Sequence, residues 1–423
     1  MSYFRDIVYL LFAVISSPFW LYRLLRTGKW RTDWPARFGR SGTTPQDRPT
    51  LLLHAVSVGE VNAIRQLVDE LARRHGDKLR IVVSATTDTG IARARQLFEP
   101  AHTVVRYPLD FTFSVRRFLR HVRPTAVALV ELEVWPTFVS ECHRRNIPVV
   151  VINGRLSERS FRRYQRIRPL FRATLARLHA VAAQDETYAL RFRDLGVALS
   201  RVFISGTMKW DTAVIRDDVP GSAELAAAMG IDRSRPLVVC GSTGDGEEEM
   251  IVDALRDVDT QLLIAPRKPE RFASARIAML NPVLRTQCPD GAANPVGRNH
   301  FLLDTLGELG KAYSLADVVI VGRTFAPMGG SDLIEPIALG KATIVGPHVE
   351  NFANAVHLLR AGRGIVQLDS ILDLEGAVRD LLADPLIRRG YAHRSREIIR
   401  KQQGATSRTA DLLDAILRNA DKL

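Results

Sequence analysis

Cysteine is scarce in this sequence. The 423 residues include three, Cys142, Cys240 and Cys288, which are widely separated and form no Cys-x-x-Cys pair. An odd number of distant cysteines predicts neither a disulfide framework nor a cysteine-ligated zinc site. This cysteine usage fits a reducing compartment best.

The amino terminus lacks an apolar run of the roughly 20 residues that a bilayer-spanning helix needs. The run at Ile7–Tyr22 reads IVYLLFAVISSPFWLY and contains Pro18. Basic residues, starting with Arg23 and Arg26, follow it, and no small-residue cleavage site of a signal peptide comes after. We predict an uncleaved membrane anchor with a basic flank over residues 1–34, the rest of the chain being cytoplasmic. The alternative is a buried apolar helix of a soluble fold.

Acidic residues are outnumbered: 46 Asp and Glu face 59 Lys and Arg, which gives a formal net charge of +13. Such a balance suits nucleic acid, an anionic membrane surface or an acidic substrate, or reflects surplus surface arginine alone. No helix-turn-helix, zinc-finger or aromatic-basic RNA-binding motif occurs, and the basic residues are dispersed. We therefore expect no nucleic-acid partner and favour a membrane surface.

The chain also lacks fixed-period repeats and low-complexity tracts, and short apolar runs alternate instead with longer helical patterns. The first series of expected strands covers residues 51–53, 81–84, 104–107, 126–130, 149–152, 180–183 and 202–205. The second covers residues 237–240, 262–265, 318–321, 343–345 and 365–368. This alternation predicts an α/β protein with two Rossmann-like, doubly wound lobes. We expect the lobes at 35–212 and 213–406, with a C-terminal helix at 407–423 packing back on the first.

A nucleotide-binding fingerprint of the common kinds is missing. Residues Gly241–Gly246 stand between a strand and a helix, but they form neither a Walker loop nor a GxGxxG motif. A helix start of this kind suits a phosphate, with Ser242 nearby. The alternative is a glycine-rich turn whose Ser242 or Asp245 caps the helix.

Carboxylates open two other helices after predicted strands. Glu335 follows the paired glycines Gly329 and Gly330, and a carboxylate placed there can grip the two hydroxyls of a ribose. Glu60 opens a helix after the first strand, where the helix start is expected to lower its pKa and keep it ionised as a general base. The alternative for both is a carboxylate that only stabilises its helix.

Six motifs follow one another along the chain: His54–Glu60, Glu131–Pro136, Asn153–Ser157, Gly206–Asp211, Pro266–Phe272 and Gly346–His348 with Asn351–Phe352. They resemble the motifs of one family, the 3-deoxy-D-manno-octulosonic acid (Kdo) transferases of lipid A biosynthesis. The order and spacing match over nearly the whole chain. The resemblance implies a GT-B fold, with the first lobe binding the acceptor and the second binding the nucleotide sugar.

The resemblance also implies a reaction and its residues. The donor would be CMP-Kdo, and the acceptor would be an anionic lipid A precursor (lipid IVA). The transfer would invert the configuration at the sugar carbon and would need neither a metal nor a cofactor. Glu60 would be the base, with Glu131 and Lys209 stabilising the transition state. The CMP site would be formed by Pro266, Arg267, Gly307, Glu308, Leu309, Asp332, Leu333, Ile334 and Glu335. Arg37 and Arg40 would hold the phosphorylated acceptor, with the catalytic lobes on the cytoplasmic face of the inner membrane.

The sequence departs from the family at three places. Ser331–Ile334 replace part of a common Gly-Gly-His-Asn-Pro-Leu-Glu-Pro segment, Lys268 replaces a usual histidine, and Gly244-Asp245 replaces a usual His-Glu. Two other functions remain as alternatives. One is another GT-B lipid glycosyltransferase that uses a UDP-sugar, and the other is a non-catalytic, membrane-tethered sensor of sugar nucleotides, which would have no need of Glu60.

Overall fold

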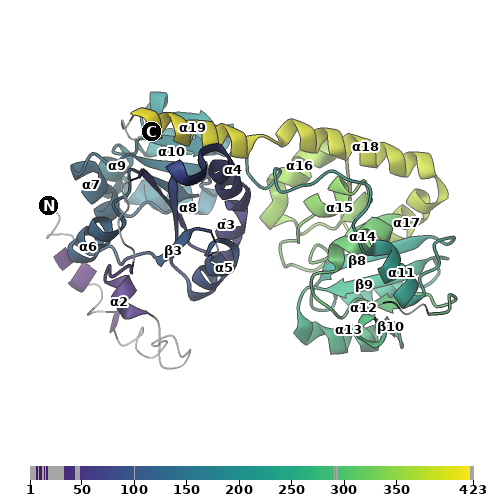
Figure 1. The fold of residues 1–423 in the computed structure, drawn as a ribbon. Coiled ribbons are helices and arrows are strands. Elements are labelled where there is room, and N and C mark those ends of the chain that lie inside the picture. Colours follow the sequence, from purple (N-terminus) through teal and green to yellow (C-terminus); the bar gives the residue numbers. More distant parts are fainter. Residues whose placement is uncertain are drawn as a thin grey trace. The chain divides into compact units, whose positions relative to one another are not determined.

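The computed structural model of the chain describes residues 6–7, 9–11, 14, 16–17, 33–42, 48–99, 101–289, 291 and 294–419. The chain divides into two compact units (Figure 1), Met1–Thr212 with Gln403–Leu423, and Ala213–Gln402. Much of the predicted anchor, including residues 18–32, lies outside the described residues. Among the described residues, none of the helices combines the length and apolar character that a bilayer crossing requires.

The first unit is built on a parallel sheet of seven strands in the order β3-β2-β1-β4-β5-β6-β7. The strands are β1 (Thr50–Ala55), β2 (Arg80–Ala85), β3 (Thr103–Arg106), β4 (Ala126–Val130), β5 (Val149–Gly154), β6 (Ala180–Ala183) and β7 (Val202–Ile204). The chain leaves β1 in one direction along the sheet and returns to build β4 on its other side. This reversal between β1 and β4 is the point at which doubly wound sheets bind ligands.

Helices cover both faces of this sheet, which is why its central strands are buried along their whole length. The helices are α2 (Trp34–Arg37), α3 (Val58–Ala63), α4 (Arg65–His75), α5 (Asp88–Phe98), α6 (Thr112–Val122), α7 (Pro136–Arg144), α8 (Glu158–Arg166), α9 (Arg168–Leu175), α10 (Glu186–Leu195) and α19 (Ala405–Asn419). Side chains alternate between two cores: Leu51 and Leu53 pack under α3, α4, α5 and α19, and Leu52 faces α6, α7, α9 and α10.

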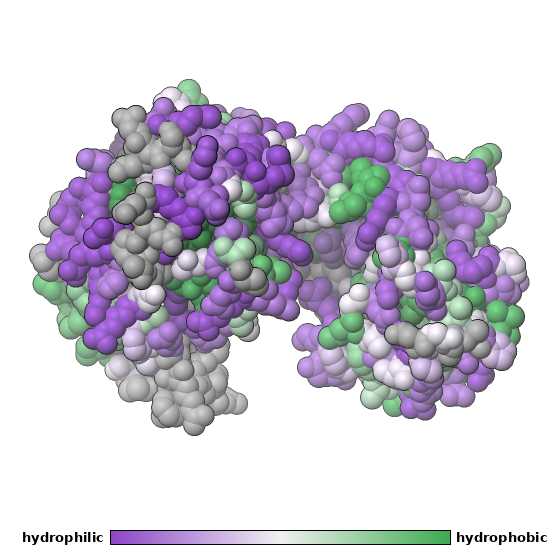
Figure 2. Space-filling model, in the orientation of Figure 1, coloured by the Kyte–Doolittle hydropathy of each residue, from purple (hydrophilic) through white to green (hydrophobic). Residues whose placement is uncertain are grey.

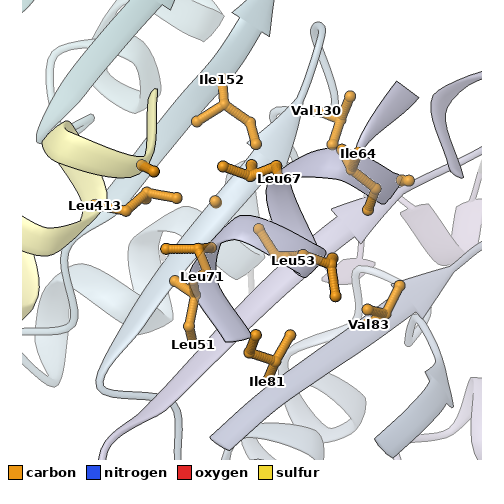
Figure 3. Close-up of a cluster of buried hydrophobic side chains, with 14 of the residues drawn as sticks. Leu51, Leu53, Ile64, Leu67, Leu71, Ile81, Val83, Val130, Ile152 and Leu413 are labelled. Carbon is orange, nitrogen blue, oxygen red and sulfur yellow. The ribbon is translucent and has the colours of Figure 1, made fainter. Parts of the chain in front are cut away.

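The last helix of the chain, α19, completes the first of these cores. Leu413 is fully buried with Leu67 and Leu71 of α4 (Figure 3). Arg74 of α4 also pairs with Asp414 of α19 at 2.9 Å. The start of α19 is held by Asp211, whose carboxylate accepts hydrogen bonds from the N–H groups of Gly404 and Thr406.

The second unit contains another parallel sheet of seven strands, in the order β10-β11-β9-β8-β12-β13-β14. The strands are β8 (Leu237–Thr243), β9 (Gln261–Pro266), β10 (Val283–Leu284), β11 (His300–Leu302), β12 (Val318–Val321), β13 (Ala342–Val345) and β14 (Val366–Gln367). The helices are α11 (Ser222–Met229), α12 (Glu247–Ala254), α13 (Phe272–Ala278), α14 (Leu309–Leu315), α15 (Ile334–Ala338), α16 (Ala353–Ala361), α17 (Leu374–Ala383) and α18 (Pro385–Gln402). The reversal point here lies between β8 and β12.

The prediction of two doubly wound α/β lobes is confirmed, and the sequence analysis missed two strands. The missed strands, β10 and β11, contain two and three residues. A run this short cannot show the alternation that identifies a strand, and these strands form only because they pair with each other and with β9.

Hydrophilic residues dominate the surface drawn in Figure 2, where apolar residues are exposed in small groups. Scattered exposed apolar side chains are normal for a folded protein. Many apolar residues of the chain lie instead in the cores that helices and strands form together.

Candidate active site

Three glutamates line one cavity at the carboxyl ends of β1 and β4. Glu60, Glu131 and Glu133 border a cavity of about 610 Å³ in the first unit. Glu60 lies in α3, which follows β1, and the other two lie in the loop after β4. Because β1 and β4 are neighbours and parallel, their carboxyl ends bring these distant residues together.

Glu60 is held firmly by the loop that precedes its helix. One carboxylate oxygen accepts a hydrogen bond from the N–H of Val56 at 2.8 Å, and the other accepts one from the Ser57 hydroxyl at 2.9 Å. Ser57 is the N-cap of α3. This is a variant of the capping box, in which the third helical residue reaches back past the cap.

The expectation that the helix start would lower the pKa of Glu60 is wrong. Burial raises the pKa of Glu60, and the charge of Glu131 adds to the rise, although the hydrogen bonds from Val56 and Ser57 oppose it. Desolvation outweighs the hydrogen bonds because the cavity removes much of the water around the carboxylate. A raised pKa makes the ionised form a stronger proton acceptor.

Glu133 is a third carboxylate, which the sequence analysis included in the Glu131–Pro136 motif without giving it a role. Burial and the neighbouring charge of Glu60 raise the pKa of Glu133 to about 7. The indole N–H of Trp135 donates a hydrogen bond to Glu133 at 3.0 Å. Two carboxylates that repel each other share protons readily, so this pair can take up a proton near neutral pH.

Glu131 occupies an unusual backbone conformation. Its φ is 58°, in the left-handed region that side chains other than glycine rarely adopt. Its N–H donates to the carbonyl of Ile152 in β5 at 3.0 Å, which extends the sheet by one hydrogen bond before the chain turns. Backbone strain of this kind is concentrated at functional sites.

The same cavity also carries positive and apolar side chains from the segment after β5. Its lining includes Arg155, Ser157, Ser160, Arg163, Tyr164, Ile167 and Phe171. Guanidinium groups and hydroxyls suit an anionic, hydroxyl-rich ligand, and the apolar residues suit a ligand with a hydrocarbon part. Of these residues, the sequence motifs included Arg155 and Ser157 but pointed to none beyond them, because α8 otherwise resembles an ordinary charged surface helix.

Lys209 lies in the turn after β7 and is half-buried, and the residues that line the cavity do not include it. Its loop is nevertheless attached to β5, because the N–H of Met208 donates to the side-chain oxygen of Asn153 at 3.3 Å. Asn153 itself has a φ of 50°. This hydrogen bond places the Lys209 loop next to the end of β5. The role of Lys209 in stabilising the transition state stays a prediction.

Arg37 and Arg40, the predicted acceptor-binding residues, differ in their surroundings. Arg37 is half-buried in α2 and donates to the carbonyl of Thr86, just after β2, at 3.4 Å. Burial and the neighbouring Arg106 lower the pKa of Arg37. Arg40 is exposed. Arg37 therefore lies at the carboxyl edge of the sheet, and Arg40 is available to solvent.

In the second unit the predicted CMP-binding residues follow strands whose carboxyl ends lie side by side. Pro266 ends β9, Arg267 is exposed, and its N–H donates to the carbonyl of Thr243 in β8 at 3.1 Å. Ser242 in β8 accepts a hydrogen bond from the Ser331 hydroxyl at 3.2 Å through its carbonyl. The segment before α15 is thereby fastened to the end of β8.

Glu335 lies in α15 and faces the start of α14. A Cβ atom added to Gly310 would lie 2.7 Å from the Glu335 carboxylate, so a larger residue there would require this carboxylate to move. Burial raises the pKa of Glu335, and the charge of Asp332 adds to the rise. Asp332 also accepts a hydrogen bond from the N–H of Ile334 at 2.9 Å. Leu333 is almost completely buried.

Glu308 lies between Gly307 and Leu309, and its carboxylate already binds other side chains of the protein. It pairs with Arg285 at 3.0 Å and accepts a hydrogen bond from Thr305 at 2.7 Å. Gly307 has a φ of 91°, which a residue with a side chain would adopt only with strain. A ligand at this turn would therefore meet mainly the backbone.

One amide of the Gly241–Gly246 segment is already used within the protein. The N–H of Gly244 donates to the carboxylate of Glu247 at 2.9 Å, and the same carboxylate accepts from the N–H of Phe325 at 2.9 Å. Glu247, Glu248 and Glu249 all lie in the first turn of α12. Carboxylates in a first turn are stabilised by the positive end of the helix, and phosphate binding at this segment stays a prediction.

Solved structures with this architecture define the fold of the protein. A glycosyltransferase from Rickettsia africae matches with a TM-score of 0.61 at 11% identity, over 88% of this chain and 100% of that chain. MurG of Acinetobacter baumannii matches with a TM-score of 0.55 at 14% identity, over 87% and 99%. Two such parallel sheets, with the polar residues after their strands, form the GT-B fold of glycosyltransferases.

Sequence relatives then define the family. The chain is 33% identical to the 3-deoxy-D-manno-octulosonic acid transferase of Bordetella pertussis, over 93% of this chain and 95% of that protein. It is 30% identical to the enzyme of the same name from Haemophilus influenzae, over 93% of both chains. The sequence model of the 3-deoxy-D-manno-octulosonic-acid transferase (kdotransferase) family matches residues 32–212. The chain belongs to this family and is a glycosyltransferase.

Proposed function

We propose that this protein transfers Kdo from CMP-Kdo to an anionic lipid A precursor, lipid IVA, with inversion at the sugar carbon and without a metal ion. The observation that carries the proposal is the cavity that joins Glu60 and Glu133 to Arg155 and Arg163. It combines a base of raised pKa with cations that suit a phosphorylated acceptor. The family membership supports Kdo as the transferred sugar.

In the proposed reaction Glu60 takes the proton from the attacking hydroxyl of the acceptor. The oxygen forms a bond to the anomeric carbon of Kdo while the bond from that carbon to the CMP phosphate breaks. CMP leaves with the electron pair, and a single displacement of this kind inverts the carbon. Glu131 and Lys209 are proposed to stabilise the charge that develops in the transition state.

The nucleotide is proposed to bind the second unit. Glu335 would hold the ribose hydroxyls and Arg267 the phosphate, with the backbone around Gly307 contributing further contacts. Loss of a charge-assisted hydrogen bond weakens binding at least about tenfold. We therefore expect CMP affinity to fall by at least that factor in Glu335→Ala and in Arg267→Ala, measured by calorimetric titration. Unchanged affinity in both folded variants would contradict the assignment.

We further propose that the protein is attached to the cytoplasmic face of the inner membrane by its amino-terminal segment. Apolar side chains are exposed there, with Leu10 60% and Val14 64% exposed. The hydroxyl of Tyr9 donates to Asp110 at 3.0 Å, and Asp6 accepts from the N–H of Thr112 at 2.9 Å, so the segment is also docked to the first unit. Exposed apolar groups on a chain with a net charge of +13 favour an anionic bilayer.

The activity test uses the purified full chain with CMP-Kdo, or a system that generates it, and lipid IVA. The mass of the lipid product should increase by whole Kdo units. A titration that compares CMP with UDP separates this function from a UDP-sugar transferase. If the protein binds CMP-Kdo but transfers no Kdo, whether CMP-Kdo is supplied or generated in the assay, it is a non-catalytic sensor of sugar nucleotides. The proposal would then fail.

A further inference from the structure

A second cavity lies at the other end of the first sheet, where β2 and β3 begin. It has a volume of about 110 Å³ and is lined by Arg48, Gly76, Asp77, Leu79, Arg80, Ile81, Ala101, His102 and Thr103. Arg80 is the first residue of β2 and Thr103 the first of β3. Glu60 follows the carboxyl end of the neighbouring parallel strand, so this cavity is at the opposite edge of the sheet from the candidate active site.

Arg80 is buried, and one nitrogen of its guanidinium has no hydrogen-bond partner among the described residues. The residue is 5% exposed, and its Nη1 atom is buried without a hydrogen bond. In the part of the chain that the structure describes, no carboxylate pairs with Arg80; its main-chain N–H donates to the carbonyl of Pro49 at 2.9 Å. A buried charge that lacks both a counter-charge and hydrogen bonds is strongly destabilising.

Other arginines of low exposure in this protein are paired with acids. Arg285, 9% exposed, pairs with Glu308 at 3.0 Å. Arg271 pairs with the buried Glu248 at 2.9 Å. Each of these two guanidinium groups has a carboxylate partner. Within the described ranges Arg80 has no such partner, and its side chain borders a cavity instead.

The remaining groups around the cavity are mostly donors. Burial lowers the pKa of Arg80, and the charge of the nearby Arg48 lowers it further. Arg48 donates to the carbonyl of Asp77 at 2.6 Å, and the Asp77 carboxylate, 3.8 Å away, is fully exposed. His102 and the hydroxyl of Thr103 can each donate a hydrogen bond. The Asp77 side chain thus extends into water at the border of the cavity, beside Arg48, Arg80 and His102.

We propose that this cavity binds a small oxyanion of the phosphate type, with Arg80 as its central ligand. A volume of about 110 Å³ corresponds to roughly three or four water molecules, each of which occupies about 30 Å³ in the liquid. A single tetrahedral oxyanion has this size. The planar guanidinium of arginine fits two oxygens of a phosphate at once. Free phosphate and the phosphomonoester head group of a lipid share this chemistry.

The first test titrates the full chain with inorganic phosphate in a buffer free of other oxyanions, against chloride at matched ionic strength. We expect a saturable rise in melting temperature, as for any ligand that binds only the folded state. Arg80→Met should reduce the phosphate affinity of this site by at least about tenfold. Arg65→Met is the matched control, because Arg65 is exposed in the same unit, and it should leave the rise unchanged.

A second readout separates a ligand site from a merely structural arginine. Without phosphate, Arg80→Met should melt at or above the temperature of the unchanged protein, because it removes a buried charge that has no partner. A structural arginine would show the opposite result, a lower melting temperature whether or not phosphate is present. Arg80→Lys keeps the charge without the planar fork and should bind phosphate more weakly than the unchanged protein.

Two further arms identify the source of the anion. Flotation with phosphatidylcholine vesicles, with and without phosphatidic acid, compares Arg80→Met with Arg65→Met. Weaker flotation of Arg80→Met alone would identify a lipid head group, and equal flotation with loss of the phosphate response would identify a free anion. The proposal is overturned if phosphate acts no differently from chloride, or if Arg80→Met responds to phosphate as Arg65→Met does. Neither outcome depends on transferase activity.

Discussion

Replacing Glu60 by glutamine tests the centre of the proposed mechanism. Glutamine keeps the shape of the side chain but cannot accept a proton. The removal of a general base typically slows a reaction by about 10² to 10⁴-fold. We therefore expect the rate of Kdo transfer to fall by that factor, while the affinity for CMP stays unchanged, because the nucleotide is proposed to bind the second unit.

The structure indicates how much stability the same replacement costs. The carboxylate of Glu60 accepts two hydrogen bonds, from the Val56 N–H and the Ser57 hydroxyl. Glutamine can keep the first through its carbonyl oxygen, and the serine hydroxyl can reverse and accept from the amide. The loss is then about 0.5 to 2 kcal/mol, as for an altered helix cap. Burial disfavours the carboxylate and not the amide, which offsets part of this loss.

Ser57→Ala is the matched control. It removes one hydrogen bond to Glu60 and leaves the carboxylate, so it should cost a similar amount of stability but keep most of the transfer rate. Since the Ser57 hydrogen bond lowers the pKa of Glu60, its loss should move the acid limb of the rate profile to higher pH. Transfer rate, CMP affinity and melting temperature are measured on one preparation. Near-normal turnover by Glu60→Gln would refute the assignment and transfer attention to Glu131 or Glu133.

Three other predictions concern stability and the nucleotide site. Between pH 4.5, the ordinary pKa of glutamate, and about pH 7, folded Glu133 keeps a proton that the unfolded chain releases, so its contribution to stability falls as pH rises. The free energy of unfolding of Glu133→Gln, measured with urea, should therefore increase relative to that of the unchanged protein from pH 4.5 to above pH 7. Leu413→Ala should destabilise the first unit by about 2 to 5 kcal/mol, because it opens a cavity in a fully buried core. Gly310→Ala should displace the Glu335 carboxylate and weaken CMP binding in a calorimetric titration.

Each of these predictions has a control. A stability difference between Glu133→Gln and the unchanged protein that does not vary with pH would show that Glu133 has no raised pKa. Leu199→Ala, at a position 69% exposed in the same unit, should change stability little, and a loss equal to that of Leu413→Ala would contradict the packing argument. Gly376 also lies in a helix, and its added Cβ meets nothing within 4 Å, so Gly376→Ala should leave CMP affinity unchanged.

The strands that carry the candidate site could be predicted because each contains a continuous apolar run, such as Leu51–Leu53 in β1. Such a run has to be covered on both faces, which indicates a parallel sheet between helices. The same argument located Glu60 and Glu335, since each follows a strand and begins a helix. It could not locate β10 and β11, which have too few residues to show a pattern.

The amino-acid sequence by itself determined the two α/β units, the strand ends at which polar residues gather, and the family motifs. Only the tertiary structure decided which carboxylates share a cavity and how each is charged. Glu60 and Glu133 meet because β1 and β4 are neighbours, and burial raises the pKa of both. The charge of Glu131 adds to the rise at Glu60, and the charge of Glu60 adds to the rise at Glu133. Arg80 likewise differs from a surface arginine only through what surrounds it. Charge states depend on groups that are distant in the chain, and local sequence patterns carry no record of those distances.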